Sequence, residues 1–338
     1  MKRLSRKAVL LSAIAVLAVG AGLWLALRPA SAPLPPAETI VIAANTEYVG
    51  VCPVMAAQKQ GYFASRRITV QLLPYSSGRQ AMQAVVSNKA DMATVADIPV
   101  MFAAMDNIPV QVITTIFRTG QDHGLVARRD RGIAMPGDLK GKRIGVTLGT
   151  SGHFALEVFL NRQRLDTHDV QLLNYPPEGL QKALADGAVD AVSGWDPFLG
   201  LTEEQLGQNA VRFSGQDVYE SIYNMVAPSR YVRQHPQTVI RLLQALEQGE
   251  RFCRENPAAA AAFLPRLTDQ GRKALIASWP SHHFGLELDQ SLLLVLEDQS
   301  RWAIKGGLTA AREVPNFLDY IYVDGMKTVS PTDVTIIY

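Results

Sequence analysis

The sequence predicts an α/β protein with two lobes, each a mostly parallel sheet flanked by helices. Three observations predict this class. Short apolar segments of strand length alternate with segments of helical periodicity from Thr39 onward. Turns rich in Gly, Ser and Thr join several of these strands to the helices that follow. The chain has 338 residues, which is enough for two domains of ordinary size.

The first block of the chain has four predicted strands with helices between them. The helix that starts near Arg79 has its apolar residues on one side and follows a Ser-Ser-Gly turn suited to an N-cap. Another helix opens with Asp97 as its N-cap and Pro99 in its first turn. The predicted strands of this block cover residues 39–43, 68–73, 91–95 and 109–117.

The second block repeats the alternation, and the chain then closes with helices. A strand over residues 221–227 is predicted to lead back, and the helical tail that follows is predicted to pack on the first lobe. The predicted strands of the second block are residues 124–128, 143–148, 170–174 and 190–194, and the predicted tail helices are residues 236–255, 257–264, 268–277, 288–305 and 314–320.

The stretch from Leu139 to Phe154 is the most informative local pattern. A short apolar strand ends at Leu148, the turn Gly149-Thr150-Ser151-Gly152 follows, and a segment of helical spacing begins. The free N–H groups and the dipole of a helix N-terminus favour an anion at such a turn. Because many strand-to-helix turns of α/β proteins look like this one, the stretch alone does not identify a ligand site.

Polar and aromatic residues follow several of the predicted strands, where open α/β sheets bind their ligands. Each has a plainer interpretation: Ser77 and Asp97 as N-caps, Trp195 as core, Arg118 in a salt bridge, and the others on a loop or helix surface. Two helix N-termini, several carboxylates and two aromatics together suit a small polar or zwitterionic ligand. The candidate ligand-binding residues are Glu47, Tyr48, Ser77, Gly78, Asp97, Arg118, Thr150, Ser151, His153, Trp195 and Asp196.

Composition and motif spacing exclude several function classes. Five of the 33 basic residues lie in the first 28 positions, so the rest of the chain has 28 basic against 31 acidic residues and no basic stripe for a nucleic acid. No His or Cys spacing indicates a metal site, and no nucleophile motif such as G-x-S-x-G occurs. A catalytic set brought together only by folding stays open.

The two cysteines, Cys52 and Cys253, are far apart in the sequence. A disulfide between them is an alternative, but two isolated buried thiols are the favoured interpretation.

The N-terminus predicts export. Residues 8–27 carry no charge, follow a basic segment and are long enough to span a bilayer. Ala30-Ser31-Ala32 suits signal peptidase, but Pro33 fits it poorly, so a cleaved signal and a retained anchor both stay open. In either case the body lies outside the cytoplasmic membrane. Residues 1–32 are therefore expected to be a signal peptide or anchor, and residues 33–38 a linker.

The chain resembles the periplasmic substrate-binding proteins of ABC importers for nitrate, sulfonates and taurine, which share a fold with thiamine-precursor synthases. The resemblance covers roughly residues 40–320, and its pieces occur in family order. They are Ala57 to Phe63, Ser76-Ser77-Gly78, Asn88 to Asp91, Asp138 to Val146, Gly149 to Phe154, Asn174 to Pro177, Asp186 to Ala191, Trp195 to Phe198, and His235-Pro236. The loop from Glu47 to Pro53 and the Ala before Asp97 depart from many relatives, so no relative's ligand is carried over.

The resemblance implies the two-lobed periplasmic-binding-protein type II fold, with a ligand cleft between lobes that close by hinge motion. It implies a first lobe of residues 39–122 and 226–338, a second lobe of residues 123–225, and crossing segments near 120–126 and 222–228. It also implies a monomer that needs no cofactor and delivers a small anion to a membrane permease and its ATPase. The alternatives are a thiamine-precursor-synthase-like enzyme and a membrane-tethered sensor.

Overall fold

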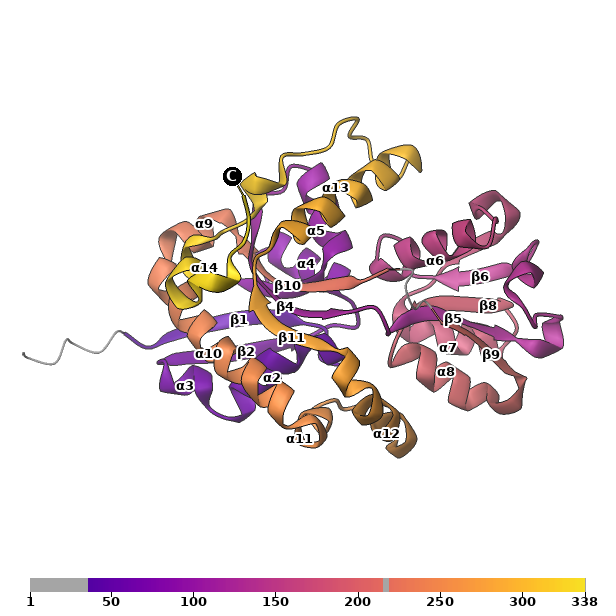
Figure 1. Ribbon diagram of the computed structural model, residues 1–338, viewed down its shortest axis with the longest axis horizontal. Helices are drawn as coiled ribbons and strands as arrows, with labels where there is room; N and C mark the ends of the chain where they lie inside the picture. The colour runs from indigo at the N-terminus through magenta and orange to yellow at the C-terminus, as the bar shows by residue number, and fades with distance from the viewer. Residues whose placement is uncertain (1–35, 215–218, 338) are drawn as a thin grey trace, which may run out of the picture. The chain divides into compact units, whose positions relative to one another are not determined.

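The computed structural model describes residues 36–214 and 219–337 of the chain. It confirms the α/β class: two sheets are flanked by helices (Figure 1). The first sheet has the strand order β11-β4-β10-β3-β1-β2. Its strands are β1 (Glu38–Ala44), β2 (Ile68–Pro74), β3 (Met92–Ala96), β4 (Val110–Thr119), β10 (Ser221–Pro228) and β11 (His283–Glu287).

The second sheet has the strand order β7-β6-β8-β5-β9. Its strands are β5 (His123–Arg128), β6 (Arg143–Val146), β7 (Gln171–Asn174), β8 (Ala191–Trp195) and β9 (Ala210–Ser214). A separate cluster of buried apolar side chains packs on each face of this sheet, one around Leu156 and Ile144 and the other around Leu180 and Val192.

Both sheets are mixed rather than mostly parallel. The βα units give parallel pairs, β1 with β2 and β3, and β6 with β7 and β8. Strands β10 and β5 run antiparallel to their neighbours β3 and β8. The reason is topological, because each of these strands enters its sheet directly from the other one rather than through a helix of its own sheet.

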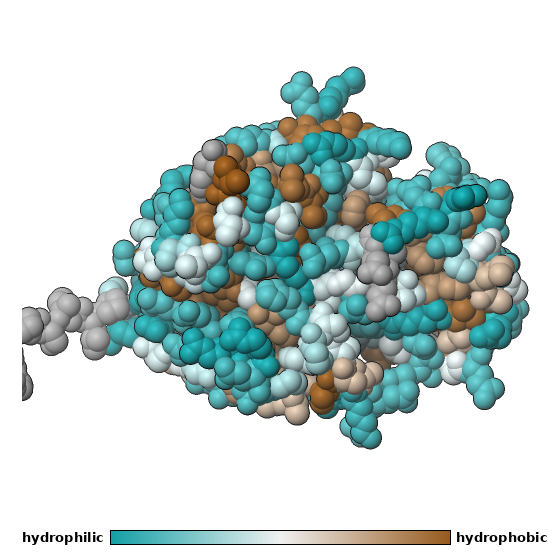
Figure 2. All heavy atoms as spheres, in the orientation of Figure 1, coloured by the Kyte–Doolittle hydropathy of each residue, from teal (hydrophilic) through white to brown (hydrophobic). Residues whose placement is uncertain are grey.

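The longer helices cover the sheets, and the local sequence explains where they begin. Helix α4 starts after Ser77, whose hydroxyl accepts the N–H of Gln80 as an N-cap, and it buries Ala81, Met82 and Val85. The face seen in Figure 2 is largely hydrophilic, as expected when apolar side chains fill the core. The helices are α2 (Cys52–Lys59), α3 (Tyr62–Ser65), α4 (Gly78–Val86), α5 (Asp97–Met105), α6 (Ser151–Arg162), α7 (Pro177–Ala185), α8 (Phe198–Leu206), α9 (Ser229–Gln234), α10 (Pro236–Glu255), α11 (Pro257–Ala261), α12 (Asp269–Ser278), α13 (Gln290–Lys305) and α14 (Asp324–Val329).

The chain passes between the sheets at two places. It leaves the first sheet at Thr119, the end of β4, and enters the second at His123, the start of β5. It returns between Ser214 and Ser221. The expected lobe boundary at residue 225 falls within β10, because residues 221–228 form this strand in the middle of the first sheet, paired with both β3 and β4.

The tail is not purely helical. Strand β11 interrupts it and pairs antiparallel with β4, and the expected helix over residues 314–320 is a short 3₁₀ turn at Phe317–Tyr320. The sequence from His283 to Glu287 has few β-branched residues. Its strand conformation therefore comes from pairing with β4, which supplies a free edge, rather than from local propensity.

The expectation of two free thiols is wrong. Cys52 and Cys253 form a disulfide with a Cα–Cα distance of 6.2 Å across 201 residues of sequence. It joins the first residue of α2 to α10, and these helices pack closely where Gly249 faces the Pro53 carbonyl oxygen. The pairing could not be predicted from the sequence, because only the packing of α10 on α2 brings the two side chains together.

The predicted export or anchor segment at residues 8–27 lies outside the described residues, as do residues 33–35 of the expected linker. Within residues 36–214 and 219–337, no helix is both long and apolar enough to cross a membrane.

We expect the disulfide to contribute substantially to stability, because it constrains a long loop in the unfolded chain. The double variant Cys52→Ser/Cys253→Ser should lower the free energy of unfolding by about 2–5 kcal/mol. Chemical denaturation measures this change. Reductant should shift the wild-type transition in the same direction and leave the double variant unmoved; equal stability of the two oxidised proteins would contradict the prediction.

Candidate functional site

A small cavity of about 20 Å³ lies at the edge where the two sheets meet. Both sheets contribute to it. The carboxyl ends of β1, β3 and β8 reach it, and so do the first residues of β5 and β10, which run antiparallel to them. Its lining consists of Asn45, Tyr48, Ser77, Gly78, Arg79, Ala96, Pro99, His123, Thr150, Ser151, Trp195, Ser221 and Tyr223.

The structure brings together six of the eleven residues proposed from the sequence. They come from the loop after β1, the N-terminus of α4, the N-terminus of α6 and the end of β8. These six are Tyr48, Ser77, Gly78, Thr150, Ser151 and Trp195. The stretch around Gly149 thus forms one wall of the cavity, and the Ser76-Ser77-Gly78 turn forms another.

Two helix N-termini and a guanidinium make the cavity attractive to an anion. Helices α4 and α6 both begin at its wall, so their first N–H groups and dipoles act there. Arg79 lines the cavity from α4 and donates a hydrogen bond to the Leu148 carbonyl of the opposite lobe. Gly149 allows the turn its left-handed conformation, with φ of 70°.

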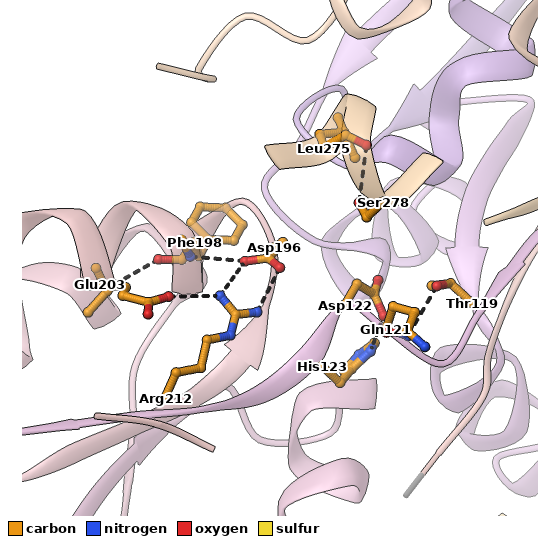
Figure 3. Close-up of polar contacts among 12 residues, drawn as sticks. Thr119, Gln121, Asp122, His123, Asp196, Phe198, Glu203, Arg212, Leu275 and Ser278 are labelled. Atoms are coloured by element: carbon orange, nitrogen blue, oxygen red, sulfur yellow. Dashed lines mark hydrogen bonds and ion pairs between the residues drawn. The ribbon is translucent and has the colours of Figure 1, made fainter. Parts of the chain in front are cut away.

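A chain of hydrogen bonds links the loop after β1 to α6. The Tyr48 hydroxyl donates to Asp122 Oδ2 at 2.6 Å, and Asp122 Oδ1 is 2.7 Å from His123 Nδ1. His123 Nε2 in turn is 2.9 Å from the Ser151 hydroxyl. Figure 3 shows Asp122 and His123 side by side at the crossing between the sheets.

This chain of hydrogen bonds keeps the Asp122 carboxylate ionised. Burial by itself would raise the pKa of Asp122, but the adjacent His123 and the hydrogen bonds from His123 and Tyr48 outweigh it and hold this pKa below its usual range. The pKa of Tyr48 is raised well above its usual value, first by burial and then by the Asp122 charge. Asp122 is therefore an ionised acceptor, and Tyr48 is a neutral donor to it.

Asp97 is buried away from the cavity lining. Its Oδ1 accepts hydrogen bonds from the Tyr219 hydroxyl and from its neighbouring Ile98 N–H. Burial raises the pKa of Asp97, with the hydrogen bond from Tyr219 acting in the opposite direction. The structure thus gives Asp97 a role in holding Tyr219 rather than an exposed position beside a ligand.

Arg118 and His153 also lie outside the lining. Arg118 pairs with Glu287 and with Asp289 at 2.7 Å, so it joins the end of β4 to β11 and to the residue that caps α13. His153 Nε2 lies 3.3 Å from Glu157, and its ring packs against Trp302. The Trp302 indole donates to Glu157 at 2.8 Å, which ties α13 to α6.

Glu47 and Asp196 line a second, larger cavity between α8 and α12. Each is already paired with an arginine. The Asp196 carboxylate accepts hydrogen bonds from both terminal nitrogens of Arg212, at 2.7 and 3.2 Å. Glu47 Oε1 lies 2.8 Å from Arg266 Nε. Figure 3 shows Arg212 held between Asp196 and Glu203, apart from the Asp122–His123 pair. In the described part of the chain, no group of three or more His, Cys, Asp or Glu residues is arranged to hold a metal ion.

Sequence reasoning missed Arg79, Asn45, Ser221 and Tyr223. Arg79 directly follows the Ser-Ser-Gly turn, so a helix N-terminus with a cation in its first turn was the signal for it. Ser221 and Tyr223 begin an antiparallel strand. Ser221 and Tyr223 do not follow a strand, so the rule that ligands lie after strand ends does not point to them. They still reach the cavity because the start of an antiparallel strand lies at the same sheet edge as the end of its neighbour.

The sequence is similar to a known family and to named binding proteins. The NMT1/THI5-like family model matches residues 49–260. A Bacillus subtilis protein named as an aliphatic sulfonates-binding protein is 25% identical over 228 residues, covering 66% of this chain and 68% of its own. The taurine-binding periplasmic protein of Escherichia coli is 26% identical over 166 residues, covering 46% of this chain and 51% of its own. These relatives confirm the family resemblance stated from the sequence.

Solved structures share the fold. The alkanesulfonate-binding protein SsuA of Xanthomonas axonopodis pv. citri, bound to MOPS, has a TM-score of 0.74 at 19% identity and covers 85% of this chain and 98% of its own. The desulfurization enzyme DSZB has a TM-score of 0.62 at 18% identity, covering 87% of this chain and 99% of its own. The fold therefore serves both binding proteins and an enzyme.

The buried Asp97 gives a pH-dependent prediction. Its pKa is higher in the folded chain than in the unfolded one, so it favours folding below the unfolded value of about 4 and disfavours it as pH rises toward the folded value. Asp97→Asn cannot titrate and should gain stability relative to wild type as pH rises, by at most about 1.4 kcal/mol per pH unit.

Denaturation midpoints measured from pH 4 to pH 8 test this expectation. Asp106→Asn, an exposed aspartate just after α5, is the matched control and should follow wild type at every pH. Parallel wild-type and Asp97→Asn curves would contradict the prediction.

Proposed function

The chain belongs to the NMT1/THI5-like family, and from that premise we propose that it is an extracytoplasmic solute-binding protein of an ABC importer. It captures a small organic sulfonate or related anion by closure of its two lobes. It then delivers the ligand to a membrane permease coupled to an ATPase. The observation that carries this proposal is a cavity walled by two helix N-termini and Arg79.

The sign of the ligand's charge is argued from the donors and acceptors in the wall. Asp122, the carboxylate behind the cavity, has both oxygens occupied by Tyr48 and His123. Arg79 and the first N–H groups of α4 and α6 are donors, and the Ser77 hydroxyl keeps its proton free because its oxygen accepts from Gln80. A wall rich in donors favours an anion over a free amine.

The mixed polarity of the cavity wall supports a sulfonate with a small carbon skeleton. Ala96, Pro99 and the rings of Trp195 and Tyr223 line the same space as the donors. One part of the wall can therefore pack against carbon while another binds sulfonate oxygens. Taurine adds an amine to this pattern and nitrate removes the carbon, so both are weaker fits to the residues present.

Lobe closure is supported by where the lining residues come from. Tyr48, Ser77 and Arg79 belong to the first lobe, and Thr150, Ser151 and Trp195 belong to the second. A ligand that touches both sets bridges the lobes, and the crossing at residues 120–122, between β4 and β5, is where the backbone rotates. The export segment expected from the sequence supports an action outside the cytoplasmic membrane.

Ligand screening by thermal unfolding tests the proposed ligand class. At about 100 times its dissociation constant, a small alkanesulfonate should stabilise the folded chain by roughly 2.7 kcal/mol and raise the unfolding midpoint. Taurine, nitrate and a short alkylamine serve as comparisons. If the alkanesulfonates leave the midpoint unmoved, the proposed ligand class is wrong.

Arg79→Gln should weaken sulfonate binding, because it removes a charge-assisted hydrogen bond worth about 1.5–3 kcal/mol, equivalent to roughly 10- to 150-fold in affinity. Titration calorimetry measures the loss. Lys89→Gln is the matched control, since Lys89 is an exposed cation just after the same helix and does not line the cavity. Equal affinities of wild type and Arg79→Gln would show that the guanidinium does not hold the anion.

A further inference from the structure

We propose that Ser151 is a nucleophile, activated by His123 and Asp122, that cleaves small esters bound in this cavity. The structure brings a serine, a histidine and an aspartate into one hydrogen-bonded chain, although no motif in the sequence announces it. The proposal goes beyond ligand binding, since it assigns a covalent activity and a substrate class to the same cavity.

The geometry meets the requirements of an activated serine. Ser151 Oγ is 2.9 Å from His123 Nε2, and His123 Nδ1 is 2.7 Å from Asp122 Oδ1. The first distance lets a nucleophile pass its proton to a base, and the second lets a carboxylate orient that base. Asp122 and His123 are each 3% exposed and Ser151 is 6% exposed, so little water competes for these bonds.

The chemistry of the groups sets the direction of each hydrogen bond. An ionised Asp122 can only accept, so the proton of this contact lies on His123 Nδ1. In a neutral imidazole Nε2 then has no proton and accepts the hydrogen of the Ser151 hydroxyl. This is the tautomer that a general base needs, and the bond from Tyr48 to the second Asp122 oxygen holds the carboxylate in place.

The position of Ser151 also supplies electrostatic stabilisation. Ser151 is the first residue of α6 and follows β6 through the Gly149 turn, so it stands at a strand-to-helix junction. The N–H groups of Ser151 and Gly152 begin α6 and have no acceptor within that helix, so they can donate to an oxyanion formed at Ser151. Arg79 lines the same cavity and adds a positive charge.

The reaction balances without any further reactant than water. Ser151 Oγ attacks the ester carbonyl carbon while its proton moves to His123 Nε2. The bond from carbon to the leaving alkoxide then breaks, and His123 returns the proton to the alkoxide to give an alcohol. Water, deprotonated by His123, next attacks the acyl-serine; the acid leaves and Ser151 recovers its hydroxyl.

Several groups besides Asp122 surround His123 and hold its ring in place. The Tyr219 ring packs against it at 5.2 Å and Trp195 at 6.2 Å. The Asp97 carboxylate interacts with the His123 charge, and His282 with the Asp122 charge, from other elements.

Covalent labelling tests the proposal directly. Phenylmethanesulfonyl fluoride should form a sulfonyl ester at Ser151, with loss of fluoride and of the serine proton, detected by intact mass and located by peptide sequencing. The purified protein should also hydrolyse p-nitrophenyl acetate, after correction for the reaction in buffer. Ser151→Ala should abolish both, and His123→Gln should slow labelling by at least about 100-fold.

Ser87→Ala, an exposed serine on α4's C-terminal side, is the control and should label like wild type. An unmodified wild type, label at another residue, or labelling that His123→Gln leaves unchanged would overturn the proposal. Sulfonate binding is measured separately by thermal shift. If alkanesulfonates shift the midpoint but Ser151 is not labelled, the binding function is retained and the nucleophile is rejected. If Ser151 is labelled but alkanesulfonates do not shift the midpoint, the nucleophile is retained and the binding function is rejected.

Discussion

The carboxylate of Asp122 is the group on which the rest of the cavity depends. It lies at the crossing between the two sheets, is almost fully buried, and stays ionised because Tyr48 donates to one oxygen and His123 to the other. Tyr48 belongs to the first lobe, whereas His123 begins the second sheet and reaches Ser151 on α6. One buried charge therefore links residues from both walls of the cavity. A buried carboxylate left without donors costs several kcal/mol, so the two donors cannot move independently of it.

The two helix N-termini at the cavity are also held in place by the fold. The side chain of Ser77 caps α4, and the Thr150 hydroxyl donates to the Thr147 carbonyl at 2.6 Å, so both turns are held by their own side chains. At Gly152 even a methyl group would lie 3.1 Å from the Gly194 backbone, so α6 sits directly against the end of β8. The donors are thus placed by packing before any ligand arrives, and a preorganised wall gives up less entropy when it binds.

The sequence pattern predicted the features that depend only on residues close together in the chain. Strand-to-helix turns at Ser77 and Thr150 and the α/β class follow from short-range periodicity and capping chemistry. What depends on packing at a distance was not predictable. Arg118 turns toward Glu287 and Asp289, Cys52 meets Cys253, and Asp97 holds Tyr219, because segments more than 100 residues apart come together. The Asp122–His123–Ser151 chain belongs to this second class: its first two members are neighbours, but Ser151 joins them only in the folded sheet.

Binding and catalysis place opposite demands on one proton. To hold a sulfonate, Ser151 must point its hydroxyl hydrogen at the anion, and it is free to do so only when this hydrogen leaves its contact with His123 Nε2. To attack an ester, the same hydrogen must point at Nε2. A bound anion therefore draws the hydrogen away from the base, whereas a neutral ester leaves it on the contact between Ser151 and His123. The charge of the bound molecule thus selects which of the two chemistries this single arrangement performs.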